Sequence, residues 1–72
     1  MDDATAQRAL DAHLALTRIA RHPEQDPAWQ AILDDLREAE AWLAAIESRT
    51  IAQHLTYRRI HRILHPNGRR SL

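Results

Sequence analysis

The chain contains no cysteine, no lysine and no phenylalanine, and it has one glycine among its 72 residues. Without cysteine it forms no disulfide bond, no thiolate zinc site and no thiol nucleophile. A single glycine excludes the glycine-rich loops that bind phosphate groups. No apolar run approaches the roughly 20 residues that a membrane-spanning helix needs. These absences predict a protein that does not span a membrane and has no thiol chemistry.

The length of the chain allows one domain at most, and we expect a single helical domain over residues 1–72. The first residues, Met1-Asp2-Asp3, lack the basic and apolar regions of a signal peptide, which predicts a cytoplasmic protein. All ten basic residues are arginine. This codon preference favours a bacterial or phage genome that is rich in G and C.

The net charge of zero hides a division along the chain. Residues 1–47 carry all ten acidic residues and four arginines, a net charge of −6, whereas residues 48–72 carry six arginines and no acid, a net charge of +6. Such asymmetry indicates either an anionic partner or self-association in which acidic and basic parts pair.

Helix-forming residues dominate the chain, and we predict an all-α fold. Asp26 is placed to cap a helix, and Pro27 suits the first turn of that helix. Pro66-Asn67-Gly68 ends the helical region. The predicted segments are a first helix over about 3–21, a loop over 22–27, a second helix over about 28–65 and a basic tail over 66–72.

Apolar residues recur at alternating steps of three and four along the second helix, which is the spacing of a coiled coil. Neither glycine nor proline interrupts residues 28–65, so we expect one continuous helix of about 57 Å, against about 28 Å for the first helix. The first helix then covers only half of the apolar stripe, and a second copy would cover the rest. We therefore predict a helical hairpin that forms a homodimer, with core and dimer residues Trp29, Ile32, Leu36, Leu43, Ile46, Ile60 and Leu64.

An alternative fold breaks the second helix near Ser48. Ser48 can cap a third helix. Three helices of about 19, 20 and 17 residues would then pack as a monomeric three-helix bundle.

The sequence shows no arrangement of residues for catalysis. Neither serine lies in the Gly-x-Ser-x-Gly signature of a nucleophile. A helical chain of this length rarely forms the concave pocket that an enzyme needs. We expect no enzymatic activity, no cofactor and no small-molecule substrate.

Two histidines, His61 and His65, lie one helical turn apart, a spacing at which two imidazoles can share a metal ion. No carboxylate lies within two turns along the chain to complete the ligand set. Arg58, Arg62 and Arg69 on the same side would repel a dication. The sequence therefore predicts no metal site. Another histidine, His13, lies within the apolar arc of the first helix and is expected to be a partly buried core residue.

Residues 48–55, Ser-Arg-Thr-Ile-Ala-Gln-His-Leu, resemble the start of the recognition helix in LuxR-type helix-turn-helix regulators. The glycine-containing turn that precedes this helix in those regulators is replaced here by Ala44-Ala45-Ile46-Glu47. The segment after it is out of register by two residues. The resemblance implies DNA binding, with Gln53, His54 and Arg58 at base edges and Arg59 at a phosphate.

Basic and apolar side chains share the last turns of the second helix. Tyrosine and arginine are enriched where proteins bind one another. We therefore predict a small non-enzymatic regulator, inhibitor or adaptor that binds and modulates another protein. The alternative is a DNA- or RNA-binding regulator that uses the same basic segment, because arginine readily contacts phosphates. The predicted partner-binding residues are Leu55, Tyr57, Arg58, Arg59, Arg62 and Ile63.

Overall fold

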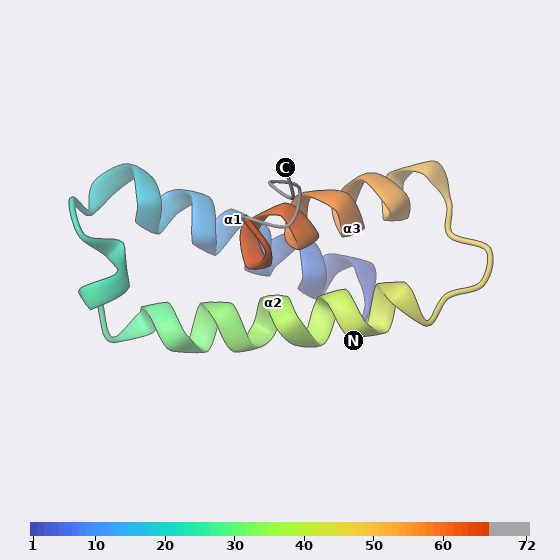
Figure 1. Cartoon of the computed structure of the whole chain (residues 1–72), viewed down its shortest axis with the longest axis horizontal. Helices are drawn as coiled ribbons and strands as arrows, with labels where there is room; N and C mark the ends of the chain where they lie inside the picture. Colours follow the sequence, from blue (N-terminus) through green and yellow to red (C-terminus); the bar gives the residue numbers. More distant parts are fainter. Residues whose placement is uncertain (67–72) are drawn as a thin grey trace, which may run out of the picture.

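The computed structural model describes residues 1–66, and over these residues it consists of three α-helices and one short 3-10 helix. The helices are α1 (Asp3–Ile19), η1 (Pro23–Gln25), α2 (Ala28–Ala44) and α3 (Ile51–Leu64). Figure 1 shows α2 along one side, with α1 and α3 both running back over it in the opposite direction. The predicted all-α fold is confirmed.

The connection between α1 and α2 forms where the two prolines of the sequence predicted a loop. Helix α1 ends at Ile19, two residues before the predicted end, and its first turn is capped by the Asp2 carboxylate, which accepts from the Thr5 N–H at 2.8 Å. The Asp26 carboxylate accepts from the Ala28 N–H at 2.8 Å. Asp26 therefore satisfies a free donor at the start of α2, as predicted.

The predicted continuous helix over residues 28–65 is wrong. Helix α2 ends at Ala44, and α3 begins at Ile51 after six intervening residues. Thr50 and Gln53 form a capping box: Thr50 Oγ1 accepts from the Gln53 N–H, and Gln53 Oε1 accepts from the Thr50 N–H, both at 3.0 Å. This reciprocal pair satisfies two helix-start donors and fixes a new helix there. The alternative of a break near Ser48 describes the chain better, although the capping residue is Thr50.

One long side chain, Arg49, holds the loop between α2 and α3 in place. Its guanidinium donates to the Leu43 carbonyl oxygen at 3.0 Å, in the last turn of α2, and this carbonyl also accepts from the Ile46 N–H at 3.2 Å. The same guanidinium lies over the Tyr57 ring, 4.7 Å from its centroid. Arg49 therefore ties the end of α2 to the second turn of α3.

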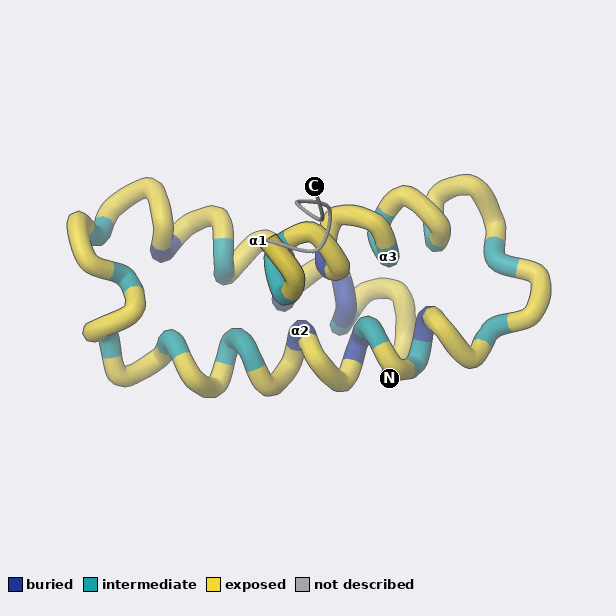
Figure 2. Tube along the Cα trace, in the orientation of Figure 1, coloured by how far each residue is buried: buried dark blue, intermediate teal, exposed yellow. Residues whose placement is uncertain are grey.

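The reversal of direction at this loop places the two halves of the apolar stripe face to face. Leu36 and Leu43 from α2 and Ile60 from α3 are fully buried in one cluster. Ala6 and Ala9 of α1 join this cluster, and their small side chains let the helix approach closely. The tube in Figure 2 shows buried segments on the inward sides of the helices.

The seven residues predicted for the core and the dimer all lie at least partly in the interior. Leu36, Leu43 and Ile60 are buried, whereas Trp29 is half-buried beside α1. The others, Ile32, Ile46 and Leu64, are half-buried and pack against the buried cluster. Since α3 folds back onto α2, a single chain covers the stripe, and the length argument that predicted the homodimer no longer applies.

Within residues 1–66, none of the helices combines the length and the apolar character needed to cross a membrane. Of the predicted basic tail over residues 66–72, the structure describes Pro66 alone. Residues 67–72 lie outside the described part.

Candidate functional site

The side of α3 that faces away from the core combines aliphatic and cationic residues, and we call it the outer face. Its first half carries Ile51 and Leu55, one turn apart, which are 82% and 55% exposed. Its second half carries Arg58, Arg59 and Arg62, all exposed. At 100° per residue these five positions lie within about one third of the helix circumference. They form a continuous strip opposite the buried Ile60.

The three arginines of the outer face form no ion pair with any of residues 1–66. Helix α3 contains no acidic residue that could neutralise them within the helix. The exposed acids of α2 lie on another helix, and Asp34 there pairs with Arg37 of its own helix at 2.9 Å. The positive charge predicted for this part of the chain is therefore available to an external anionic group.

Four of the six predicted partner-binding residues, Leu55 and the three arginines, lie on the outer face. Tyr57 and Ile63 do not, because both are half-buried and pack against the core. Tyr57 serves the structure instead: it carries the Arg49 guanidinium on its ring.

A shallow groove of about 510 Å³ runs beside the outer face. Along it, the rings of His54, Tyr57, His61 and His65 follow one another with centroid separations of 6.3, 5.7 and 4.5 Å. The side chains of Arg58 and Arg62 also line the groove. The groove is therefore cationic on one wall and aromatic on the other.

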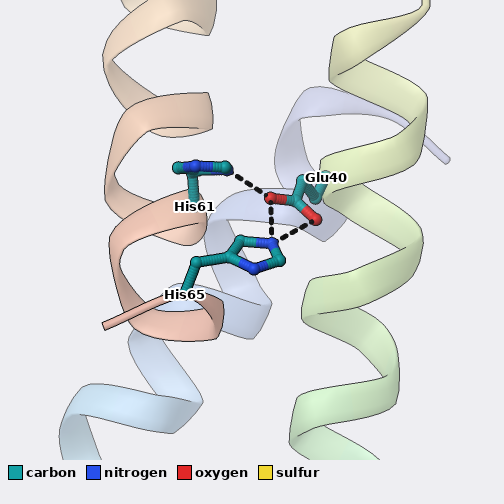
Figure 3. A group of neighbouring side chains, drawn as sticks. All are labelled: Glu40, His61 and His65. Carbon is teal, nitrogen blue, oxygen red and sulfur yellow. Dashed lines mark hydrogen bonds and ion pairs between the residues drawn. The ribbon is translucent and has the colours of Figure 1, made fainter. Parts of the chain in front are cut away.

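Glu40 of α2 reaches across to the histidines at the end of α3 (Figure 3). Its Oε2 lies 2.7 Å from Nδ1 of His61 and 3.1 Å from Nε2 of His65. The carboxylate thus accepts from either imidazole that carries a proton on the facing nitrogen. Two nitrogens and a carboxylate oxygen are also ligands for a transition metal.

The approach of Glu40 to the two histidines was not predicted from the sequence. Along the chain no carboxylate lies within two turns of the histidines, and Glu40 is 21 residues before His61. The fold brings them together because α3 reverses over α2. The sequence carried no signal for this pairing beyond the presence of an acid on a neighbouring helix.

His13 is half-buried, as the sequence predicted, and its ring lies 5.4 Å from the Trp29 ring, centroid to centroid. Burial lowers the pKa of His13 below its ordinary value, since desolvation penalises the charged imidazolium. His13 is therefore part of the packing between α1 and the start of α2.

No protein family model matches this chain, and no curated protein and no solved structure is significantly similar to it. The resemblance of residues 48–55 to a LuxR-type recognition helix gains no support from the structure. Ser48 lies outside α3, since Thr50 is the capping residue. Gln53, expected at base edges, is already engaged in the capping box and donates to Asp3 of α1 at 3.1 Å.

Proposed function

We propose that this chain is a small non-enzymatic adaptor or regulator of the cytoplasm that binds an acidic surface of another protein through the outer face of α3. The carrying observation is the combination on one strip of two exposed aliphatic side chains, Ile51 and Leu55, with three arginines that form no ion pair within residues 1–66. No catalytic step, cofactor or small-molecule substrate enters this proposal.

The aliphatic residues favour a protein as the partner. Burying an exposed leucine or isoleucine fully contributes about 1.5–3 kcal/mol. A phosphate backbone offers no apolar surface of this kind to Ile51 or Leu55. A protein surface with a hydrophobic centre and a polar rim does.

The arginines define the charge of the partner. Arg58, Arg59 and Arg62 would accelerate the encounter with an acidic surface and orient it, and arginine is common among the residues that dominate interface energies. An acidic partner that offers an apolar pocket to Leu55 fits both halves of the strip. The exposed acids of α2 on a second copy of the chain are one such surface. Light scattering, which detects self-association, should therefore accompany any binding assay.

Nucleic acid is the second candidate, and the groove beside the outer face favours it. Arg58 and Arg62 line this groove together with three histidines, and these side chains donate hydrogen bonds of the kind that phosphate oxygens accept. Binding of this type weakens steeply with salt, with a log–log slope of about −0.9 per phosphate neutralised on duplex DNA.

The test compares four forms of the full chain: wild type, Leu55→Ser, Arg58→Glu and Ile19→Ser. Ile19 is the control, because it is an aliphatic residue at the last position of α1 and is 83% exposed. Each form is immobilised and incubated with host extract, and the captured proteins are identified by mass spectrometry. A partner retained by wild type and Ile19→Ser but lost with Leu55→Ser and with Arg58→Glu is then purified and titrated by calorimetry.

Two outcomes contradict the proposal. Equal capture by all forms would show that the outer face plays no part in recognition. Tight binding of labelled duplex DNA or structured RNA that is insensitive to Leu55→Ser and collapses between about 50 and 200 mM salt would establish the nucleic-acid function instead.

A further inference from the structure

Three potential ligand atoms converge between α2 and α3 at the Glu40–His61–His65 cluster. One ligand atom from each residue, two imidazole nitrogens and a carboxylate oxygen in all, lies within 4.8 Å of the other two. We propose that Glu40, His61 and His65 bind one divalent transition-metal ion of the Zn²⁺ class and that this ion fastens α3 to α2. The site does not depend on the partner-binding function proposed above.

The two separations between the carboxylate and the imidazoles are close to those around a tetrahedral metal. Bonds of about 2.0–2.1 Å to nitrogen and carboxylate oxygen set neighbouring ligand atoms about 3.3 Å apart in a tetrahedron. The separations from Oε2 of Glu40 are 2.7 Å to His61 and 3.1 Å to His65. Small rotations of the exposed imidazole rings would lengthen these two separations to the value of about 3.3 Å that a tetrahedral metal requires.

The donor set selects the class of metal. Two imidazoles and one carboxylate suit zinc and other late first-row ions, whereas calcium and magnesium prefer oxygen ligands throughout. Three protein ligands also leave a fourth position for water or for an external anion. The histidines line the groove beside the outer face, so this fourth ligand would come from the groove.

The carboxylate of the cluster is largely buried, whereas the two imidazoles are exposed and leave a path by which a metal ion could enter. The side chain of Glu40 is 20% exposed, while those of His61 and His65 are 51% and 49% exposed. The metal would enter from the histidine side. An imidazole coordinates only through a nitrogen that carries no proton, so a ring that donates to the carboxylate must first lose that proton or transfer it to its other nitrogen.

Arg58 and Arg62 oppose the binding of a dication but do not prevent it. Both are exposed, so salt and water screen their charges over about 8–10 Å. Glu40 supplies a negative charge inside the cluster, which no residue of α3 provides. The two arginines would also favour an anion in the fourth position.

The experiment uses the full chain without a histidine tag and freed of metal. Zinc sulfate is titrated at neutral pH against a chromophoric chelator, and thermal unfolding is followed by circular dichroism at each zinc concentration. We expect saturable binding of one ion per chain and a melting temperature that rises with zinc, because a ligand that binds the folded state stabilises it. Cobalt in place of zinc should give the visible absorption of a tetrahedral site.

Variants distinguish the three-residue site from general binding to histidines. Glu40→Gln, His61→Asn and His65→Asn should each weaken zinc binding at least about tenfold, which is the lower end of the loss caused by removing even an outer partner of a metal ligand. Glu38→Gln, an exposed acid of α2, and His54→Asn, a groove histidine outside the cluster, are the matched controls and should bind as wild type. Circular dichroism verifies that each variant retains its helices.

Any one of three results would overturn the proposal. The first is wild-type protein that shows no saturable binding and no zinc-dependent rise in melting temperature. The second is Glu40→Gln that binds as tightly as wild type, which would leave only an ordinary histidine pair. The third is half an ion per chain with dimerisation, which would place the site between two copies.

Discussion

The two faces of α3 differ in how far their apolar side chains are buried. The inner face carries Ile60, fully buried against α2, and the outer face carries Ile51 and Leu55, which remain exposed although they are just as apolar. Burial therefore does not follow from hydrophobicity alone in this helix. What decides it is the direction in which α3 leaves the loop, and that direction depends on Arg49, Thr50 and Gln53.

Truncation of the inner face tests this comparison with the largest expected effect. Ile60→Ala should lower the free energy of unfolding by about 2–5 kcal/mol, because it removes buried methyl groups and leaves a cavity. Leu55→Ala on the outer face should change it by no more than about 0.5 kcal/mol. Urea unfolding followed by circular dichroism measures both, and similar losses for the two variants would show that α3 does not pack as described.

Replacing Arg49 should have the next largest effect on the free energy of unfolding, because its guanidinium joins the end of α2 to Tyr57. Arg49→Ala loses a charge-assisted hydrogen bond and a cation–π contact, and we expect a loss of about 1–2 kcal/mol. The loss is moderated because the Nε of Arg49 is buried without a hydrogen-bond partner among the described residues. Arg49→Lys is the informative companion: lysine keeps the charge but lacks the planar group, so it should recover only part of the loss.

Thr50 fixes where α3 begins. Thr50→Ala should cost about 1 kcal/mol, whereas Thr50→Ser should keep most of the stability, since serine caps equally well. Denaturant midpoints of the three forms give the comparison. If Ser48→Ala were more damaging than Thr50→Ala, the start of α3 would have to be reassigned to the earlier residue.

His13 extends the comparison of buried and exposed residues to α1. Its contribution to the pH dependence of stability should be the smallest of these effects. Burial lowers its pKa in the folded chain below the ordinary 6.5 that it regains on unfolding. Below about pH 6.5 the unfolded chain therefore binds a proton that the folded chain does not, and stability falls as the pH decreases towards the folded-state pKa. His13→Gln should remove this component.

Urea unfolding of wild type and His13→Gln at about pH 7.5 and 5.5 isolates the His13 contribution, because the other titrating groups are common to both proteins. The stability of wild type should drop more than that of the variant. An identical drop would mean that His13 is as accessible to protons in the folded state as in the unfolded state.

The periodicity of the sequence was sufficient to predict the centre of the core. The apolar spacing identified Leu36, Leu43 and Ile60 as core positions, and all three are fully buried. The two prolines and Asp26 predicted the connection between α1 and α2, because they act on the local backbone. These features are local, so they need no knowledge of the rest of the fold.

The second connection was not predictable from the same rules. The pattern Thr50-x-x-Gln53 has the form of a capping box, but the same residues also fit the middle of a helix. The spacing of three and four residues continues through the loop with only Thr50 and Gln53 polar, and no glycine or proline interrupts it, which made one long helix the simpler interpretation. Packing of α3 onto α2 decided the matter, because burying Ile60 in the same chain stabilises the broken helix.

The candidate sites divide in the same way. The helical character of the chain, the positive charge of its last third and the position of Leu55 beside the arginines were all predictable, because they follow from residue order and helical geometry. The contact of Tyr57 with Arg49 and the approach of Glu40 to His61 and His65 became visible only in the fold. Contacts between residues far apart in the chain depend on where the chain reverses, and the reversal at residues 45–50 is set by side-chain contacts that form only in the folded protein.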